Sequence, residues 1–142
     1  MPSEPPSSRV YGRRPRILVV DGDPSVIRAL SQVLRESRPE LLINTAPGAA
    51  QALAALAEHA YDVVLTDWQV PGQGGRVVLD ALRTRYPETA CVVHSSQVEA
   101  GDTLQRHPVH VVLAKPASKS EILVAIDGAL RRVASARVRA AS

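Results

Sequence analysis

Five short apolar segments, each followed by a stretch with helical periodicity, constrain the fold of this 142-residue chain more than any other feature. Each segment is rich in aliphatic and mostly β-branched residues and is far too short to span a bilayer. The segments are Ile17–Val20, Leu41–Thr45, Tyr61–Thr66, Ala90–Val93 and Val109–Leu113. Continuous apolar runs of this length are typical of strands that are buried on both faces of a parallel sheet. We therefore predict an α/β fold with a doubly wound, five-stranded parallel sheet and five helices.

The predicted helices follow the strands, and two of them begin at recognisable capping signals. Asp23 before Pro24 combines a capping carboxylate with a proline that suits the first helical turn. Ser118 and Glu121 have the spacing of a capping box. We expect helices that start at Pro24 and at Ser118, and three others over Pro47–His59, Val77–Tyr86 and Val98–Arg106.

The chain length and composition favour a single domain between two basic ends. Of the residues, 45% are hydrophobic and 22% are charged, which is ordinary for a globular protein with a sizeable core. We expect a flexible leader over residues 1–15, one domain over 16–133 and a basic C-terminal tail over 134–142. The tail could either extend the last helix or fray.

The charge distribution and the single cysteine exclude several classes of function. Four arginines lie in residues 1–16 and four in 131–142, whereas residues 17–130 hold nine basic and thirteen acidic residues. An acidic body is a poor match for phosphates, so we expect no specific nucleic acid binding. Cys91 cannot form an internal disulfide, and no Cys/His group has zinc-ligand spacing. With no apolar leader either, we expect a cytoplasmic protein without membrane insertion.

Polar side chains stand at the ends of four predicted strands. These residues are Asp21 and Asp23 after the first strand, Asp67 after the third, Ser95 and Ser96 after the fourth, and Lys115 after the fifth. Doubly wound sheets bind ligands at the carboxyl ends of their strands, where these side chains can converge. Carboxylates, a hydroxyl and a lysine suit a hard cation such as Mg²⁺ beside phosphate oxygens. An aspartate in such a site can attack a phosphoryl group and become an acyl phosphate.

In their order and spacing, these motifs resemble the receiver domain of two-component response regulators over about residues 16–133. The resemblance rests on Ile17-Leu18-Val19-Val20-Asp21, on the run from Asp62 to Gly72, on Ser95-Ser96 and on Lys115-Pro116. The interval is 46 residues from Asp21 to Asp67, 28 from Asp67 to Ser95 and 20 from Ser95 to Lys115. These intervals are close to the usual spacing of that family. The resemblance implies a flavodoxin-like receiver fold and a signalling domain rather than a conventional enzyme.

The resemblance also implies a role for each site residue. Asp67 would accept a phosphoryl group from a histidine kinase or phosphotransfer protein, with Lys115 contacting the phosphate and Ser95 as the switch hydroxyl. Mg²⁺ would be held by Asp21, Asp67 and the backbone carbonyl of Gln69. Asp23 could be a further metal ligand or could simply cap the first helix. Phosphorylation would switch protein–protein interactions, and a homodimer could form through the fourth helix, fifth strand and fifth helix.

Two departures from the family pattern leave an alternative function open. Gly22 stands where the family usually has a second acidic metal ligand, and Val112 replaces an aromatic switch residue. Both favour a pseudo-receiver, an interaction module with weak or no Mg²⁺-dependent phosphorylation. An unrelated small α/β enzyme is disfavoured because the sequence has no glycine-rich nucleotide loop or nucleophile elbow. We interpret the four histidines, His94 among them, as structural.

Overall fold

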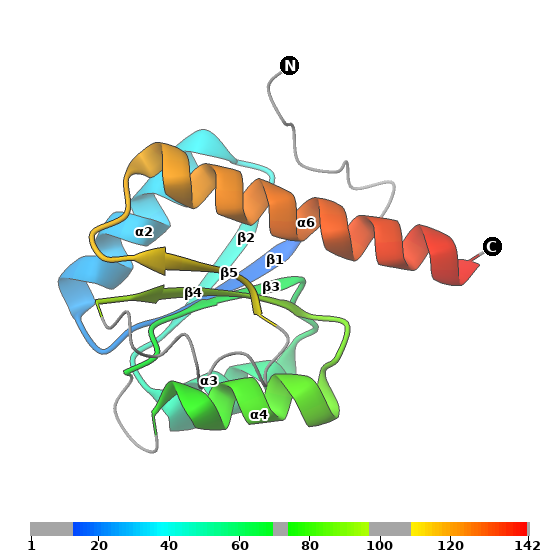
Figure 1. The fold of residues 1–142 in the computed structure, drawn as a ribbon, viewed down its shortest axis with the longest axis horizontal. Coiled ribbons are helices and arrows are strands. Elements are labelled where there is room, and N and C mark those ends of the chain that lie inside the picture. The colour runs from blue at the N-terminus through cyan, green and yellow to red at the C-terminus, as the bar shows by residue number, and fades with distance from the viewer. Residues whose placement is uncertain (1–12, 70–73, 97–108, 142) are drawn as a thin grey trace.

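The structure is a computed structural model that describes residues 13–69, 74–96 and 109–141. Its strands form one parallel sheet in the order β2-β1-β3-β4-β5 (Figure 1). The strands are β1 (Arg16–Val20), β2 (Leu42–Ala46), β3 (Val63–Thr66), β4 (Ala90–Ser95) and β5 (Val109–Ala114). All five predicted strands and the doubly wound arrangement are confirmed. The strand order reverses between β1 and β3, which is where ligand sites form in such sheets.

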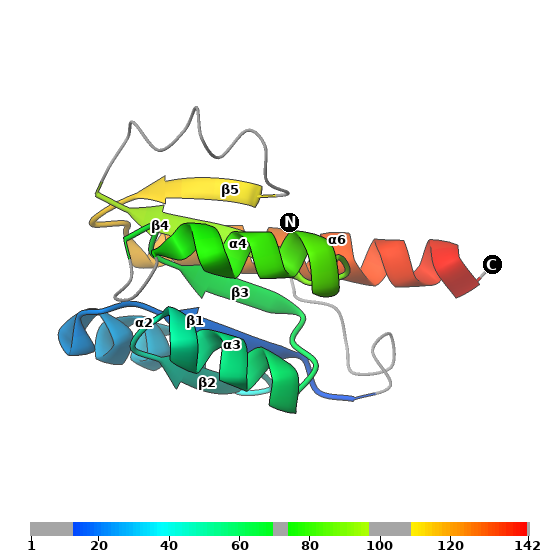
Figure 2. The ribbon, with the colours of Figure 1, turned by 90° about the horizontal axis from the view of Figure 1, so that it is seen from below.

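In the part of the chain that the structure describes, two helices cover each face of the sheet. In Figure 1, α2 (Pro24–Ser37) and α6 (Lys119–Ala141) lie above the strands, and α3 (Ala49–Glu58) and α4 (Gly75–Arg85) lie below them. Figure 2 shows α3 and α4 side by side across the lower face. The described residues thus contain four helices, and the fifth predicted helix, Val98–Arg106, lies outside them.

The core is divided by the sheet into two apolar clusters, as the alternation of side chains along a strand requires. Ile17 and Val19 of β1 pack with α2 and α6, whereas Leu18 and Val20 pack with α3 and α4. None of these four side chains is more than 1% exposed. The central strand is therefore buried on both faces, which explains its continuous apolar sequence.

The last helix is longer than its apolar contacts require. The capping box is formed: Ser118 N–H donates to Glu121 Oε1 at 3.0 Å, and Glu121 N–H donates to Ser118 Oγ at 3.1 Å. From this cap α6 continues to Ala141, so residues 134–141 of the predicted tail extend the helix. Among the described residues, no helix has both the length and the apolarity that a membrane span requires.

Candidate functional site

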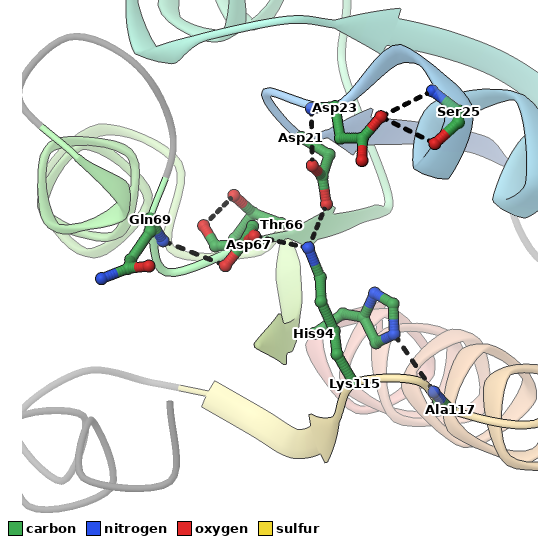
Figure 3. A network of polar contacts seen from close by, with 9 residues as sticks. All are labelled: Asp21, Asp23, Ser25, Thr66, Asp67, Gln69, His94, Lys115 and Ala117. Carbon is green, nitrogen blue, oxygen red and sulfur yellow. Dashed lines mark hydrogen bonds and ion pairs between the residues drawn. The ribbon is translucent and has the colours of Figure 1, made fainter. Parts of the chain in front are cut away.

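The polar residues after β1, β3 and β5 converge at one edge of the sheet (Figure 3). Because Val20 of β1 pairs with Thr66 of β3, the next residues, Asp21 and Asp67, stand beside each other at the point where the strand order reverses. The Asp67 N–H donates to the Val20 carbonyl at 3.0 Å, which extends the pairing of the two strands by one residue. Both aspartates are buried, with exposures of 2% and 8%.

The Lys115 ammonium lies between these two carboxylates. Its Nζ donates to Asp21 Oδ2 at 2.7 Å and to Asp67 Oδ2 at 2.6 Å. The backbone of Lys115 is held in turn, because its N–H donates to the Ser95 carbonyl at 2.9 Å. Burial lowers the pKa of Lys115, but hydrogen bonds and charges from Asp21 and Asp67 outweigh it, so this pKa lies above its usual range.

A local backbone turn orients each carboxylate toward the lysine. Asp21 Oδ1 accepts the Asp23 N–H at 2.9 Å, and Asp67 Oδ1 accepts the Gln69 N–H at 3.0 Å. In both cases the aspartate accepts an N–H two residues further along the chain, as in an Asx turn. Each carboxylate therefore has one oxygen on its own turn and the other on the shared ammonium.

The Asp23 side chain makes its hydrogen bonds to the first turn of α2 and not to Asp21, Asp67 or Lys115. Its Oδ1 accepts the Ser25 N–H at 2.9 Å and the Ser25 hydroxyl at 2.7 Å, and Asp23 is the N-cap of α2. These hydrogen bonds from the Ser25 hydroxyl and N–H lower the pKa of the Asp23 carboxyl. The contacts are those of the helix cap, one of the two roles that the sequence left open.

Ser95 and His94 end β4, the strand between β3 and β5. Ser95 is 2% exposed and its carbonyl accepts the Lys115 N–H, so it lies at the same edge as the aspartates. His94 is 5% exposed, and its Nε2 accepts the Ala117 N–H at 3.4 Å. The pKa of His94 lies below its ordinary value. Burial lowers it most and the charge of Lys115 lowers it further, whereas the charges of Asp21 and Asp67 offset only part of this. The sequence analysis interpreted His94 as structural, and its place directly before Ser95 also puts it at the border of the site.

A glycine at the start of α4 lets that helix approach the loop that carries Asp67. Gly75 N–H donates to the Trp68 carbonyl at 2.7 Å. A Cβ at position 75 would lie 2.6 Å from the Trp68 carbonyl oxygen and 2.8 Å from the Asp67 carbonyl oxygen. Only glycine fits this contact, because real Cβ atoms do not come so close to backbone oxygens.

The oxygen ligands at this edge fit Mg²⁺, although Gly22 leaves them one carboxylate short of the number that the resemblance implies. Within residues 13–69, 74–96 and 109–141, no three Asp, Glu, His or Cys side chains gather as a metal cluster. Asp21 and Asp67 offer two carboxylates, and Gly22 contributes no side chain. Proteins often hold Mg²⁺ through one or two carboxylates plus phosphate oxygens and water, so two carboxylates are sufficient chemically.

The single cysteine is excluded as an alternative nucleophile. Cys91 is fully buried in β4, and burial raises the pKa of its thiol to about 12. A thiol with such a pKa is protonated at neutral pH and has little nucleophilic character.

Comparison with known sequences identifies the family of the chain. The family model of the response regulator receiver domain matches residues 17–127. A protein-glutamate methylesterase/protein-glutamine glutaminase of Cereibacter sphaeroides is 33% identical over 112 residues, which cover 75% of this chain and 30% of that protein. The transcriptional regulatory protein KdpE of Mycobacterium tuberculosis is 32% identical over 118 residues, which cover 82% of this chain and 51% of KdpE. The chain thus spans about half or less of the length of these relatives.

Solved structures agree with this assignment. The signal receiver domain of an HD domain-containing protein from Pseudomonas fluorescens Pf-5 has a TM-score of 0.80 and 28% identity, covering 87% of this chain and 99% of that one. The response regulator TrrA from Thermotoga maritima, solved in complex with Mg²⁺ and BeF, has a TM-score of 0.74 and 23% identity, with coverage of 81% and 98%. The chain therefore belongs to the response regulator receiver domain family of two-component signalling.

Proposed function

We propose that this receiver domain accepts a phosphoryl group on Asp67 from a histidine kinase or phosphotransfer protein, and that the modification switches its protein–protein contacts. The observation that carries the proposal is the position of the Lys115 ammonium, 2.6 Å from Asp67 and 2.7 Å from Asp21. This arrangement supplies a nucleophilic carboxylate and a neighbouring cation at the carboxyl edge of a parallel sheet, where phosphate ligands bind.

The phosphoryl transfer would proceed by displacement at phosphorus. An oxygen of Asp67 forms the new O–P bond while the P–N bond to the donor histidine breaks, and that bond's electron pair stays on the imidazole nitrogen. Lys115 is placed to neutralise charge on the equatorial phosphoryl oxygens, and the Ser95 hydroxyl is our candidate for contacting one of them afterwards. Bound Mg²⁺, held by Asp21, Asp67 and the Gln69 carbonyl, would supply further neutralisation of that charge.

The single tryptophan gives a direct test, because Trp68 is adjacent to Asp67. Trp68 fluorescence is recorded while Mg²⁺ is titrated into the protein and beryllofluoride is then added. We expect a saturable change for the wild type and none for Asp67→Ala. A flat wild-type response in millimolar Mg²⁺ would contradict the proposal and favour the pseudo-receiver.

The pseudo-receiver is the second candidate because two features of the switch machinery are absent. Gly22 removes one carboxylate from the metal shell, and Val112, 43% exposed on β5, has no ring to report a movement of Ser95. The two candidates differ in how the site responds when the missing ligand is restored. If the site is functional, Gly22→Asp should lower the Mg²⁺ concentration at half-saturation several-fold without being needed for a response. If only Gly22→Asp responds, the natural chain is a pseudo-receiver.

Three further expectations belong to this proposal. The kinase or phosphotransfer protein remains the proposed partner, and a homodimer through the surface that includes β5 and α6 is a second interaction to test. A cytoplasmic location follows if the phosphoryl donor is an intracellular kinase domain. Sedimentation with and without beryllofluoride would report any change in oligomeric state.

A further inference from the structure

Asp62 is a fully buried carboxylate that the proposed chemistry does not use. Asp62 directly precedes β3, whereas Asp67 directly follows it, so the two aspartates lie at opposite ends of the same strand. The Asp62 residue is 0% exposed. Its backbone is fixed between the neighbouring strands, because its N–H donates to the Arg16 carbonyl at 2.9 Å and its carbonyl accepts the Ala90 N–H at 3.0 Å. A buried charge with a fixed position needs partners of opposite charge.

Four donors surround the Asp62 carboxylate. Oδ2 accepts the Arg16 N–H at 2.7 Å and Arg13 Nη1 at 3.1 Å. Oδ1 accepts Arg13 Nη2 at 3.2 Å and forms an ion pair with Arg137 Nη2 at 2.9 Å. These contacts fill the acceptor capacity of a carboxylate, and two guanidinium groups share one negative charge.

The two arginines come from segments on either side of the family match at residues 17–127. Arg13 precedes β1, and Arg137 lies near the end of α6. Both views place the start of β1 at the end of the sheet from which the last turns of α6 extend (Figures 1 and 2). The ends of the described chain therefore meet at one buried side chain of the domain.

Apolar packing does not explain how the end of α6 is held. Ala134 is the last buried residue of this helix. Residues 135–140 are all exposed except Arg137, which is half-buried. Arg137 also lines a hollow of about 540 Å³ whose other walls include Tyr61 and Tyr86. The contact between Arg137 and Asp62 therefore joins this exposed part of the helix to the start of β3.

We propose that Asp62 is a shared clamp, which fixes both the segment before β1 and the last two turns of α6 to the edge of the sheet opposite to Asp67. The clamp sets the direction in which α6 leaves the domain. One guanidinium is enough to neutralise Asp62, so either arginine can be lost alone, whereas losing both leaves a buried carboxylate without a cation.

The first test measures amide hydrogen exchange in α6. Arg137→Gln should speed exchange of residues 138–141 several-fold and leave residues 122–130 unchanged, because only the helix end loses its anchor. Arg139→Gln is the matched control, since Arg139 is exposed on the same turns. Equal exchange in Arg137→Gln and the wild type would overturn the clamp.

The second test asks whether the two arginines share one carboxylate. Arg13→Gln and Arg137→Gln should each lower the urea midpoint slightly, and the double variant should lower it by much more than the sum. Adding Asp62→Asn to the double variant should recover stability, because it removes the uncompensated charge. An additive double variant would overturn the proposal. If the double variant does not fold, the triple variant decides: folding supports the clamp, and failure to fold overturns it.

Discussion

At the scale of single residues, Lys115 determines the electrostatics of the edge of the sheet that carries Asp21 and Asp67. One ammonium contacts both carboxylates, so the charge of Lys115 offsets the repulsion between Asp21 and Asp67 where they stand side by side. His94, which borders this edge, does not share the role, because its Nε2 accepts the Ala117 N–H instead.

Replacing Lys115 by methionine should therefore lower the free energy of unfolding at neutral pH by about 2 kcal/mol. This is less than for a fully buried ion pair, because the lysine side chain is 18% exposed. The raised pKa of Lys115 adds a pH signature: its stabilisation is complete below the unfolded-state value of 10.5 and is lost as the pH rises through the folded-state value. Urea denaturation from neutral to alkaline pH measures both effects. Lys119→Met, at the exposed start of α6, is the control, and identical profiles for both variants would contradict the prediction.

Asp23 allows the cap and metal roles to be separated by one substitution. Serine is as good an N-cap as aspartate but lacks a carboxylate, so Asp23→Ser should keep the thermal midpoint of the wild type. If the cap is the only role of Asp23, the Mg²⁺ titration monitored by Trp68 should also be unchanged. A several-fold weaker Mg²⁺ response would instead identify Asp23 as a metal ligand.

At the scale of elements, the junction of β3 and α4 determines where Asp67 stands. The close contact of Gly75 with the carbonyls of Asp67 and Trp68 leaves no room for a Cβ. A Cβ added at Gly128 in α6 would lie 3.0 Å from Nε2 of the His110 side chain. A ring at the half-buried end of β5 can shift, but two backbone carbonyls in a paired loop cannot.

The same substitution at these two glycines should therefore have opposite effects. Gly75→Ala should destabilise the domain by about 1–3 kcal/mol and reduce the beryllofluoride response, because the Asp67 loop must move. Gly128→Ala should stabilise it by up to about 1 kcal/mol, since alanine is the better residue inside a helix. Thermal unfolding of both variants is the measurement, and a destabilised Gly128→Ala beside a neutral Gly75→Ala would refute this account.

At the scale of the whole molecule, ion pairs join elements that are distant in the sequence. Arg38, which ends α2, donates to Asp127 of α6 through Nε at 3.0 Å and through Nη2 at 2.6 Å. Asp127 is 2% exposed, so this bidentate pair ties the two helices that cover one face of the sheet.

Arg38→Met should be strongly destabilising, by roughly 3–5 kcal/mol, because it leaves a buried carboxylate without its partner. The double variant Arg38→Met, Asp127→Leu should recover most of this loss, since two apolar side chains can pack where the charges were. Urea unfolding of both variants and of Asp127→Leu alone completes the cycle. A double variant no more stable than Arg38→Met would show that the desolvation argument is wrong.

The sequence by itself determined where strands and helices follow one another along the chain and which polar residues stand at the strand ends, because these signals are local. A buried strand shows a continuous apolar run, and a helix start shows its cap within three residues, as at Asp23 and Ser118. With parallel pairing, the rule that ligands gather at carboxyl strand ends was enough to bring Asp21, Asp67 and Lys115 to one edge.

Only the tertiary structure decided which partner each charged group has. The sequence could not show that Lys115 contacts both aspartates, that Asp23 is bound to Ser25, or that α6 continues to Ala141. It also held no sign that Arg13 and Arg137 meet at Asp62. Such contacts join residues far apart in the chain, so their geometry depends on how the helices pack on the sheet. A side chain's own neighbours in the sequence carry no record of that packing.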